Sequence, residues 1–234
     1  MSTSTHTTAT GQIIYPDSDG KPMAENTLQY EWIVTIKGGI ADLFRDDPDV
    51  FVAGDLLWYP VEGDPRTCTA PDTMVAFGRP AGHRSSYKQW EEGGLAPQVV
   101  FEVLSHSNRP REMALKIEFY RKYGVLEYYV FDPNVHPHRL NGWLREGLDE
   151  PYQAIPECDG WISPRLGIRF NLEGGELVIH RPDGRRFLSF DELCRQADAA
   201  VRQADAAMRD LEVAELRNAQ LREKLRALGV DPDA

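Results

Sequence analysis

The sequence has few cysteines, no excess of basic residues and no long apolar run. Cys68, Cys158 and Cys194 lie far apart in 234 residues, which excludes a disulfide framework and a four-cysteine zinc site. Lys and Arg number 26 against 37 Asp and Glu, and a net charge of −11 argues against a protein that coats nucleic acid. No apolar run approaches the roughly 20 residues of a membrane helix, and residues 1–11 lack the pattern of a secretory signal. These absences predict a cytoplasmic α/β protein that does not enter membranes.

Changes in composition divide the chain into four predicted parts. Residues 1–25 mix Thr, Ser, Gly, Pro and Asp without periodicity, which predicts a mobile N-terminal arm. Residues 26–188 carry helix and strand patterns and are predicted to form a folded domain. Residues 189–229 follow a heptad pattern, which predicts a coiled-coil helix, and residues 230–234 are left as a short tail.

Within the domain, apolar patterns predict helices and strands in mixed order. A four-residue spacing of apolar side chains predicts a helix over 27–44, although the Gly38–Gly39 pair counts against it. A strand at 99–104, a helix at 111–123 and a strand at 127–131 form a crossover unit, which requires a parallel strand pair. Further strands are predicted at 50–59, 73–77, 140–145, 167–171 and 176–180.

Two carboxylates of this domain are candidates for chemistry. Glu102 stands in the middle of an apolar strand, where a carboxylate is costly unless it is paired, protonated or bound to a metal. Asp72 precedes the neighbouring predicted strand and follows Pro71. Carboxylates on neighbouring strands can share Mg²⁺ or Mn²⁺, because these hard cations take oxygen ligands and keep several waters. The alternatives are a turn role for Asp72 and a structural ion pair for Glu102.

Lys116 projects from inside the apolar arc of the helix over 111–123, where a purely packing face would not place a lysine. It could form an ion pair with Glu112, one helical turn earlier. It could instead point to the end of the strand that carries Glu102. There an ammonium group could orient or help deprotonate a water, or stabilise charge on a phosphate.

This arrangement resembles the PD-(D/E)XK restriction-endonuclease-like superfamily and, within it, the Uma-two family. The resemblance covers roughly residues 50–170. It rests on Pro71–Asp72, Glu102-Val-Leu-Ser105 with Ser107, Glu112, Lys116, Tyr120, Gly124-Val-Leu-Glu-Tyr-Tyr129 and Phe131-Asp-Pro133. In the plain superfamily motif the lysine stands two residues after the glutamate, where this chain has Leu104. The Uma-two pattern places it on the following helix, as Lys116 is placed here.

The resemblance implies a restriction-endonuclease-like fold, with a mixed central sheet flanked by helices, and an endonuclease that hydrolyses DNA with Mg²⁺ or Mn²⁺. It implies Asp72 and Glu102 as metal ligands and Lys116 beside the attacking water. The superfamily often adds an acid from its first helix, for which Glu31 is the candidate and Asp55, on the first strand, the rival. The supporting residues carried over from the pattern are Ser105, Glu112 and Tyr120.

Two other functions remain open at this stage: a catalytically silent nucleic-acid-binding or scaffold protein, and a hydrolase of a smaller phosphoester. Two basic stretches bear on this choice. Residues 79–91 interleave basic and aromatic side chains, although they could equally form a surface loop. Residues 109–122 hold five basic and two acidic side chains, a net charge of +3. The predicted nucleic-acid contacts are Arg79, Arg84, Lys88, Arg109 and Arg111.

The heptads of residues 189–229 predict a helix that pairs protomers into a homodimer, or one that lies against its own domain. Asn218 falls at a core position, as is typical of parallel dimers. Parallel pairing would nevertheless oppose Asp210 with Glu215 and Arg217 with Arg222, which carry like charges. Antiparallel pairing could bring Asp210 against Arg217. The direction therefore stays open.

Overall fold

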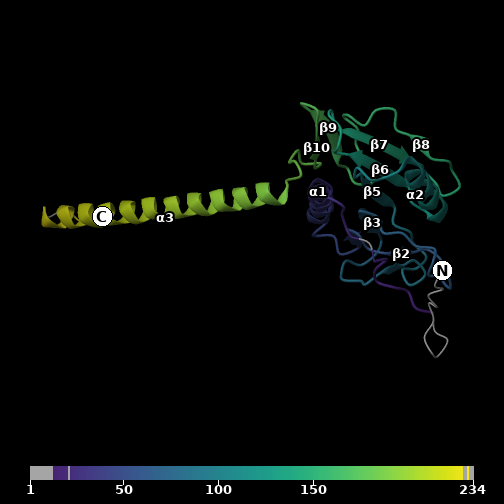
Figure 1. Ribbon diagram of the computed structural model, residues 1–234. Coiled ribbons are helices and arrows are strands. Elements are labelled where there is room, and N and C mark those ends of the chain that lie inside the picture. Colours follow the sequence, from purple (N-terminus) through teal and green to yellow (C-terminus); the bar gives the residue numbers. More distant parts are fainter. Residues whose placement is uncertain (1–12, 21, 229–230, 232–234) are drawn as a thin grey trace. The chain divides into compact units, whose positions relative to one another are not determined.

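The computed structural model describes residues 13–20, 22–228 and 231 of the chain. It divides into two compact units, residues 1–189 and 190–234. Among the described residues, the first unit contains the helices α1 (Thr27–Leu43) and α2 (Pro110–Tyr123) together with ten strands, and the second contains α3 (Phe190–Ala227) (Figure 1). Of the predicted arm and tail, residues 1–12, 21, 230 and 232–234 lie outside the described residues. None of the helices in the described part of the chain combines the length and apolarity of a membrane span.

A six-stranded sheet forms the centre of the first unit, in the spatial order β1-β3-β5-β6-β7-β8. The strands are β1 (Val50–Ala53), β3 (Thr73–Phe77), β5 (Val99–Val103), β6 (Glu127–Asp132), β7 (Arg139–Leu144) and β8 (Gln153–Ala154). Strands β5 and β6 are parallel, and every other neighbouring pair is antiparallel. The mixed sheet predicted from the crossover unit is therefore confirmed. Two small sheets pair β2 (Trp58–Tyr59) with β4 (Tyr87–Lys88), and β9 (Arg169–Glu173) with β10 (Glu176–His180).

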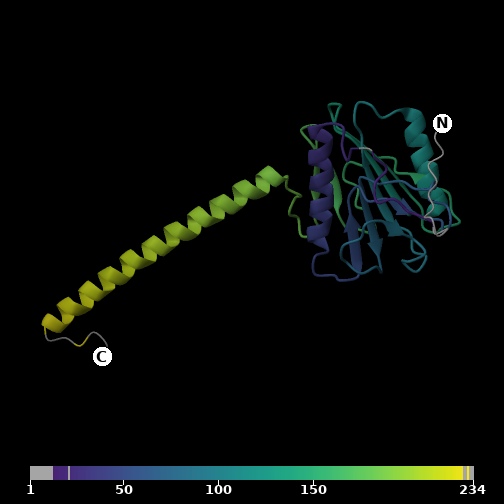
Figure 2. The same ribbon diagram turned by 60° about the horizontal axis from the view of Figure 1, so that its bottom comes forward.

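The central sheet separates two apolar cores, with α1 on one face and α2 on the other (Figure 2). Ile40 of α1 packs in the same core as Phe101, whereas Tyr120 of α2 packs in the same core as Val100. Successive residues of a strand point to opposite faces. Glu102, the next residue after Phe101, therefore points to the face that α2 covers.

The segment predicted as one strand over 50–59 is two short strands, because the chain turns at Gly54 and Asp55. Asp55 has a positive φ of 48°, and its amide donates to the carbonyl of Pro71 at 3.0 Å. A Cβ at position 54 would lie 3.2 Å from the carbonyl oxygen of Asp72, so glycine permits this close approach. The turn brings Asp55 beside the Pro71–Asp72 dipeptide.

Helix α1 runs through Gly38 and Gly39, which counted against it in the sequence. A Cβ at position 39 would overlap the ring of Phe187, so the absence of a side chain there lets this aromatic residue pack on the helix. The helix begins after Asn26, whose side chain accepts a hydrogen bond from the amide of Gln29 at 2.8 Å. Packing and capping thus offset the low helix propensity of glycine.

The described residues of the predicted N-terminal arm lie against the domain. The ring of Tyr15 packs edge-on against Tyr59, with centroids 5.2 Å apart, and tilted against Trp90 at 5.0 Å. The hydroxyl of Tyr59 donates to the carbonyl of Pro16 at 2.6 Å. These are contacts of single side chains with distant residues, and they leave no periodic pattern in the sequence.

Candidate active site

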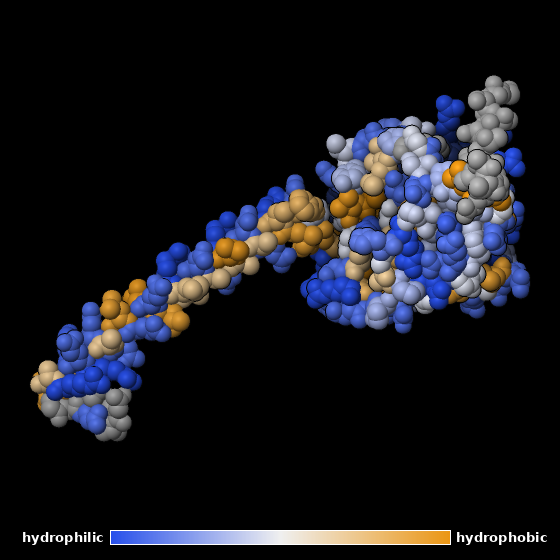
Figure 3. Space-filling view, turned by 90° about the horizontal axis from the view of Figure 1, so that it is seen from below, coloured by the Kyte–Doolittle hydropathy of each residue, from blue (hydrophilic) through white to orange (hydrophobic). Residues whose placement is uncertain are grey.

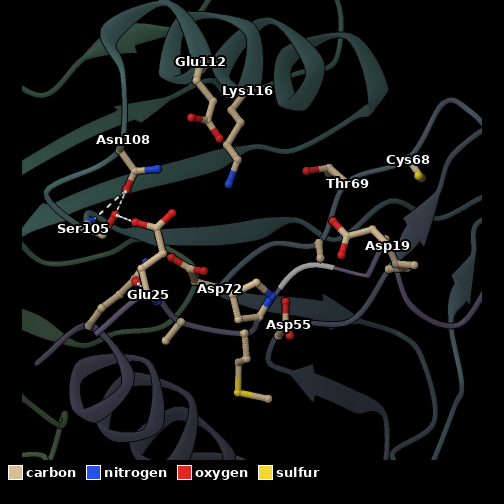
Figure 4. Close-up of a pocket in the computed structure, with 16 residues that line it drawn as sticks. Asp19, Glu25, Asp55, Cys68, Thr69, Asp72, Ser105, Asn108, Glu112 and Lys116 are labelled. Carbon is tan, nitrogen blue, oxygen red and sulfur yellow. Dashed lines mark hydrogen bonds between the residues drawn. The ribbon is translucent and has the colours of Figure 1, made fainter. Parts of the chain in front are cut away.

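A cavity of about 180 Å³ lies where β3 begins and β5 ends. It contains five of the residues proposed from the sequence: Asp55, Asp72, Ser105, Glu112 and Lys116. Figure 4 shows the Lys116 side chain pointing from α2 into this cavity, toward Asp72. The other polar side chains that line it are Asp19, Glu25, Gln29, Cys68, Thr69 and Asn108.

Glu102 lies in the sheet beside this cavity, and only 3% of its surface is exposed. Lys116 Nζ donates to Glu102 Oε2 at 2.7 Å, and the hydroxyl of Tyr120 donates to Glu102 Oε1. Burial and the Glu102 carboxylate hold the pKa of Tyr120 well above its ordinary value, so its hydroxyl remains a donor. Of the two partners considered for Lys116, the structure therefore gives Glu102 rather than Glu112.

Asp72 is also buried, and its carboxylate Oδ2 accepts a hydrogen bond from the amide of Val103 at 2.6 Å. Burial raises the pKa of Asp72 well above 3.8, and the neighbouring Glu102 carboxylate raises it further. Lys116 and the Val103 amide lower the pKa of Asp72, but they do not offset these two effects. The negative charge of Asp72 is therefore only partly compensated by the protein.

The charges around the cavity do not balance. Among the charged side chains there that are not exposed, Asp55, Asp72 and Glu102 supply three carboxylates to one ammonium group, that of Lys116, which leaves a net charge of −2 when all are ionised. The exposed Asp19, Glu25 and Glu112 add further carboxylates at the cavity. Burial lowers the pKa of Lys116, but the Glu102 and Asp72 carboxylates outweigh it and raise that pKa above 10.5. Burial also raises the pKa of Asp55. A largely buried net charge of this sign favours the uptake of protons or of a cation.

The carboxylate oxygens of Asp72 and Glu102 are donors of the kind that a hard divalent cation takes as ligands. Among the described residues, no group of three or more His, Cys, Asp or Glu side chains forms a preformed metal cage. Mg²⁺ does not require one, because it commonly binds one or two carboxylates and keeps several waters. A cavity of about 180 Å³ has room for several waters at about 30 Å³ each. Both the oxygen donors and the uncompensated charge therefore suit a hard divalent ion.

In EDTA, we expect the stability of the wild-type protein to fall as pH rises above about 3.8, because folding raises the pKa of Asp72. The folded protein retains this proton to a higher pH than the unfolded chain does. Between the unfolded pKa and the raised folded pKa, unfolding therefore releases a proton, and the free energy of unfolding decreases with pH. Asp72→Asn lacks this titration and should lose less stability. Urea unfolding of both proteins at a series of pH values measures the difference, and parallel curves would contradict the shift.

Glu25 is a cavity residue that the sequence assigned to the arm. Its carboxylate accepts hydrogen bonds from the hydroxyls of Ser105, at 2.6 Å, and Ser107. The amide of Ser105 in turn donates to Asn108 Oδ1 at 2.8 Å. The hydrogen bonds from Ser105 and Ser107 lower the pKa of Glu25. Ser105 thus anchors the N-terminal segment to the cavity, and no local pattern could have indicated this contact across 80 residues.

Glu31, proposed as an additional acid from the first helix, is exposed and does not line the cavity. Gln29 lines it instead, and its side-chain nitrogen donates to the carbonyl of Val103 at 2.8 Å. Residues two positions apart in a helix are separated by about 200° around its axis. Glu31 therefore points away from the side of α1 on which Gln29 faces the cavity. Of the two rival acids, only Asp55 lies at the cavity.

Two of the proposed nucleic-acid contacts are engaged within the domain. Arg84 Nε lies 2.5 Å from Glu92 Oε1, and its guanidinium group is 4.0 Å from the ring centroid of Phe51. Lys88 Nζ lies 3.3 Å from Glu91 Oε1. These interactions tie Arg84 and Lys88 to the domain, and the Arg84 side chain is only 15% exposed. The remaining contacts proposed from the sequence are half-buried Arg79 and exposed Arg109 and Arg111.

Comparison with known proteins gives a family and a similar solved structure. The sequence model of the Uma2 family, described as "Putative restriction endonuclease", matches residues 14–161, which is well over half of the chain. A crystal structure of "a putative nuclease belonging to DUF820" from Anabaena variabilis is 14% identical in sequence, with a TM-score of 0.47. That similarity covers 68% of this chain and 87% of the other. No curated protein matches the chain.

Proposed function

Because the chain belongs to the Uma2 (Uma-two) family, we propose that it is a metal-dependent nuclease that hydrolyses DNA phosphodiester bonds. We place the reaction at the cavity that contains Asp72 and Lys116 and adjoins Glu102. The observation that carries this proposal is the charge of that cavity, where, among the side chains that are not exposed, three carboxylates lie near a single ammonium group. A folded domain maintains such an imbalance at a cost, which a bound divalent cation would offset.

In this proposal Asp72 and Glu102 hold Mg²⁺ or Mn²⁺. When bound, the ion supplies Lewis-acid polarisation of a phosphoryl oxygen and lowers the pKa of water. Lys116 remains an ammonium group because its pKa is raised, so we assign it the stabilisation of charge that develops on the phosphate. Its raised pKa argues against a role as the base. Tyr120 donates to Glu102 and keeps that carboxylate oriented.

A second groove, of about 380 Å³, supports DNA rather than a small phosphoester as the substrate. It shares Cys68 with the cavity and extends along α2. Basic side chains suit a phosphate backbone, and aromatic rings suit unstacked bases. The basic and aromatic residues that line this groove are Arg66, Arg121, Lys122, Phe119 and Tyr123, and Glu118 lines it as the partner of Arg121 at 2.9 Å.

A catalytically silent nucleic-acid-binding protein is the second candidate, and one observation favours it. Both carboxylate oxygens of Glu102 already accept hydrogen bonds, one from Lys116 and one from Tyr120. This is the arrangement of a structural ion pair. A silent protein of this kind would bind DNA with a negative salt dependence and would not cleave it.

The two candidates are separated by incubating the full chain with supercoiled plasmid in Mg²⁺, in Mn²⁺ or in EDTA. A parallel reaction uses bis(p-nitrophenyl) phosphate as a small phosphodiester. We expect nicked plasmid with either metal and intact plasmid in EDTA. Cleavage of the small ester alone would contradict DNA as the substrate. DNA binding without cleavage of either substrate would favour the silent protein.

A further inference from the structure

Helix α3 has an exposed apolar face along its length. None of its described residues is buried, and Figure 3 shows apolar side chains following the helix. Six of the larger of these side chains are between 38% and 64% exposed. They are Leu193, Val201, Met208, Leu211, Leu221 and Leu225. A helix of 38 residues with an apolar stripe of this kind is typical of a coiled-coil protomer, and the exposed Val213 and Leu216 lie outside the stripe.

The core positions of this face differ between the two halves of the helix. In the first half they are mostly alanines, as at Ala197, Ala200 and Ala204. In the second half they include Leu221 and Leu225. In a parallel pair of such helices, alanine would pack against alanine at one end and leucine against leucine at the other. The distance between the two helix axes would therefore change along the coiled coil. The distance between packed helices depends on the side chains at the contact, so a uniform distance needs layers of similar total volume.

We propose that α3 pairs with α3 of a second copy of this chain in an antiparallel coiled coil of one defined register. In this register Ala200 lies opposite the partner's Leu225, and Ala204 lies opposite the partner's Leu221. Leu211, near the centre, lies opposite the partner's Ala214. Each of these layers joins a small residue to a large one, and the helix spacing can stay uniform. The proposal is independent of the proposed nuclease activity.

Flanking charges select the same register. The core pairing brings Asp210 beside the partner's Arg217. Because the dimer has two-fold symmetry, it contains two equivalent pairs of these opposite charges. A parallel dimer would oppose Asp210 with the partner's Glu215 and Arg217 with the partner's Arg222, which are like charges. Size and charge are separate properties of the sequence, and both favour the antiparallel pairing.

Asn218 is the residue that would favour a parallel dimer, in which two asparagines can face each other at a core position. In the antiparallel register Asn218 lies opposite the partner's Ala207 instead. Alanine is small enough to leave the asparagine amide open to water, so no polar group is buried without a partner. The like charges of the parallel alternative are not relieved in this way.

Antiparallel pairing would place the first residues of the two α3 helices at opposite ends of the coiled coil. The two Phe190 residues, at which the helices begin, would lie about 65 Å apart along the coiled coil at 1.5 Å per residue. Each domain would therefore join the paired helices at the opposite end from its partner.

Charge reversal distinguishes the two directions, because its effects have opposite signs. In the antiparallel register, Asp210→Lys and Arg217→Glu should each weaken dimerisation about tenfold, since two attractive pairs become repulsive. In a parallel dimer each of these substitutions would remove a repulsion and tighten the dimer. The double variant should regain near-wild-type affinity. Sedimentation equilibrium of the full chain measures the dissociation constant, with Asp205→Lys, outside the seam, as the matched control.

A cross-link tests the register itself. In a Cys194→Ser background, Ala200→Cys and Leu225→Cys are combined in one chain, and the protein is oxidised. We expect a covalent dimer whose joined peptides contain positions 200 and 225 from different chains. Peptides that join 200 to 200 and 225 to 225 would show a parallel dimer and overturn the proposal. A wild-type chain that sediments as a monomer at high concentration would also overturn it.

Discussion

Replacing Glu102 with glutamine is expected to lower the rate of DNA cleavage roughly a thousandfold. The substitution removes one carboxylate from the proposed metal site and one of the two charges that hold Lys116 in place. Glutamine has nearly the same volume and can still accept a hydrogen bond from Tyr120. The loss should therefore appear in cleavage more than in folding, and plasmid nicking in Mg²⁺ measures it.

Glu127→Gln is the matched control for this prediction. Glu127 is also a buried glutamate of the central sheet, but it lies on the α1 side, where it accepts hydrogen bonds from Ser163 and from the amide of Arg165. We expect this variant, once folded, to cleave DNA at close to the wild-type rate. Equal rates for both variants, high or low, would contradict a specific role for Glu102.

Replacing Lys116 with methionine is expected to lower the free energy of unfolding by roughly 2–4 kcal/mol in EDTA. The change removes the cation from a buried pair and leaves the Glu102 and Asp72 carboxylates facing each other. Lys116 is 23% exposed, which places the effect below that of a fully buried pair. Methionine keeps most of the aliphatic side chain, so the measured loss reports the missing charge. Urea unfolding provides the measurement.

Lys122→Met, on the same helix, controls for the loss of a positive charge from α2. Lys122 is exposed and lies over the ring of Tyr123, so its removal should change the free energy of unfolding by no more than about 0.5 kcal/mol. Mg²⁺ should stabilise Lys116→Met more than it stabilises Lys122→Met, because the former has the greater unpaired negative charge. A Lys116→Met protein as stable as wild type in EDTA would contradict the buried ion pair.

The sequence predicted most of the elements that form the sheet, because strand and helix patterns are local. The strand over 73–77 and that over 176–180 occur at the predicted residues, and the crossover unit has the predicted parallel pair. The cost of burying Glu102 is also visible locally, since its neighbours in the chain are apolar. These features need no knowledge of distant contacts.

Other parts of the cavity depend on contacts between distant residues and could not be predicted. The choice of Glu102 rather than Glu112 as the partner of Lys116 requires the packing of α2 on the sheet. Glu25 reaches Ser105 across 80 residues, and Asp55 reaches the cavity through a turn with positive φ. In each case the neighbouring residues in the sequence do not indicate a role for the side chain. The role depends on contacts that form only in the folded domain.

Calorimetric titration with Mn²⁺ determines whether Asp72 and Glu102 hold a divalent cation. The wild-type chain, Asp72→Asn, Glu102→Gln and the control Glu127→Gln are titrated under identical conditions. We expect saturable binding of Mn²⁺ to wild type and Glu127→Gln, and loss of this binding in Asp72→Asn and Glu102→Gln. Binding that is unchanged in those two variants, or a folded wild type that binds no Mn²⁺, would contradict it.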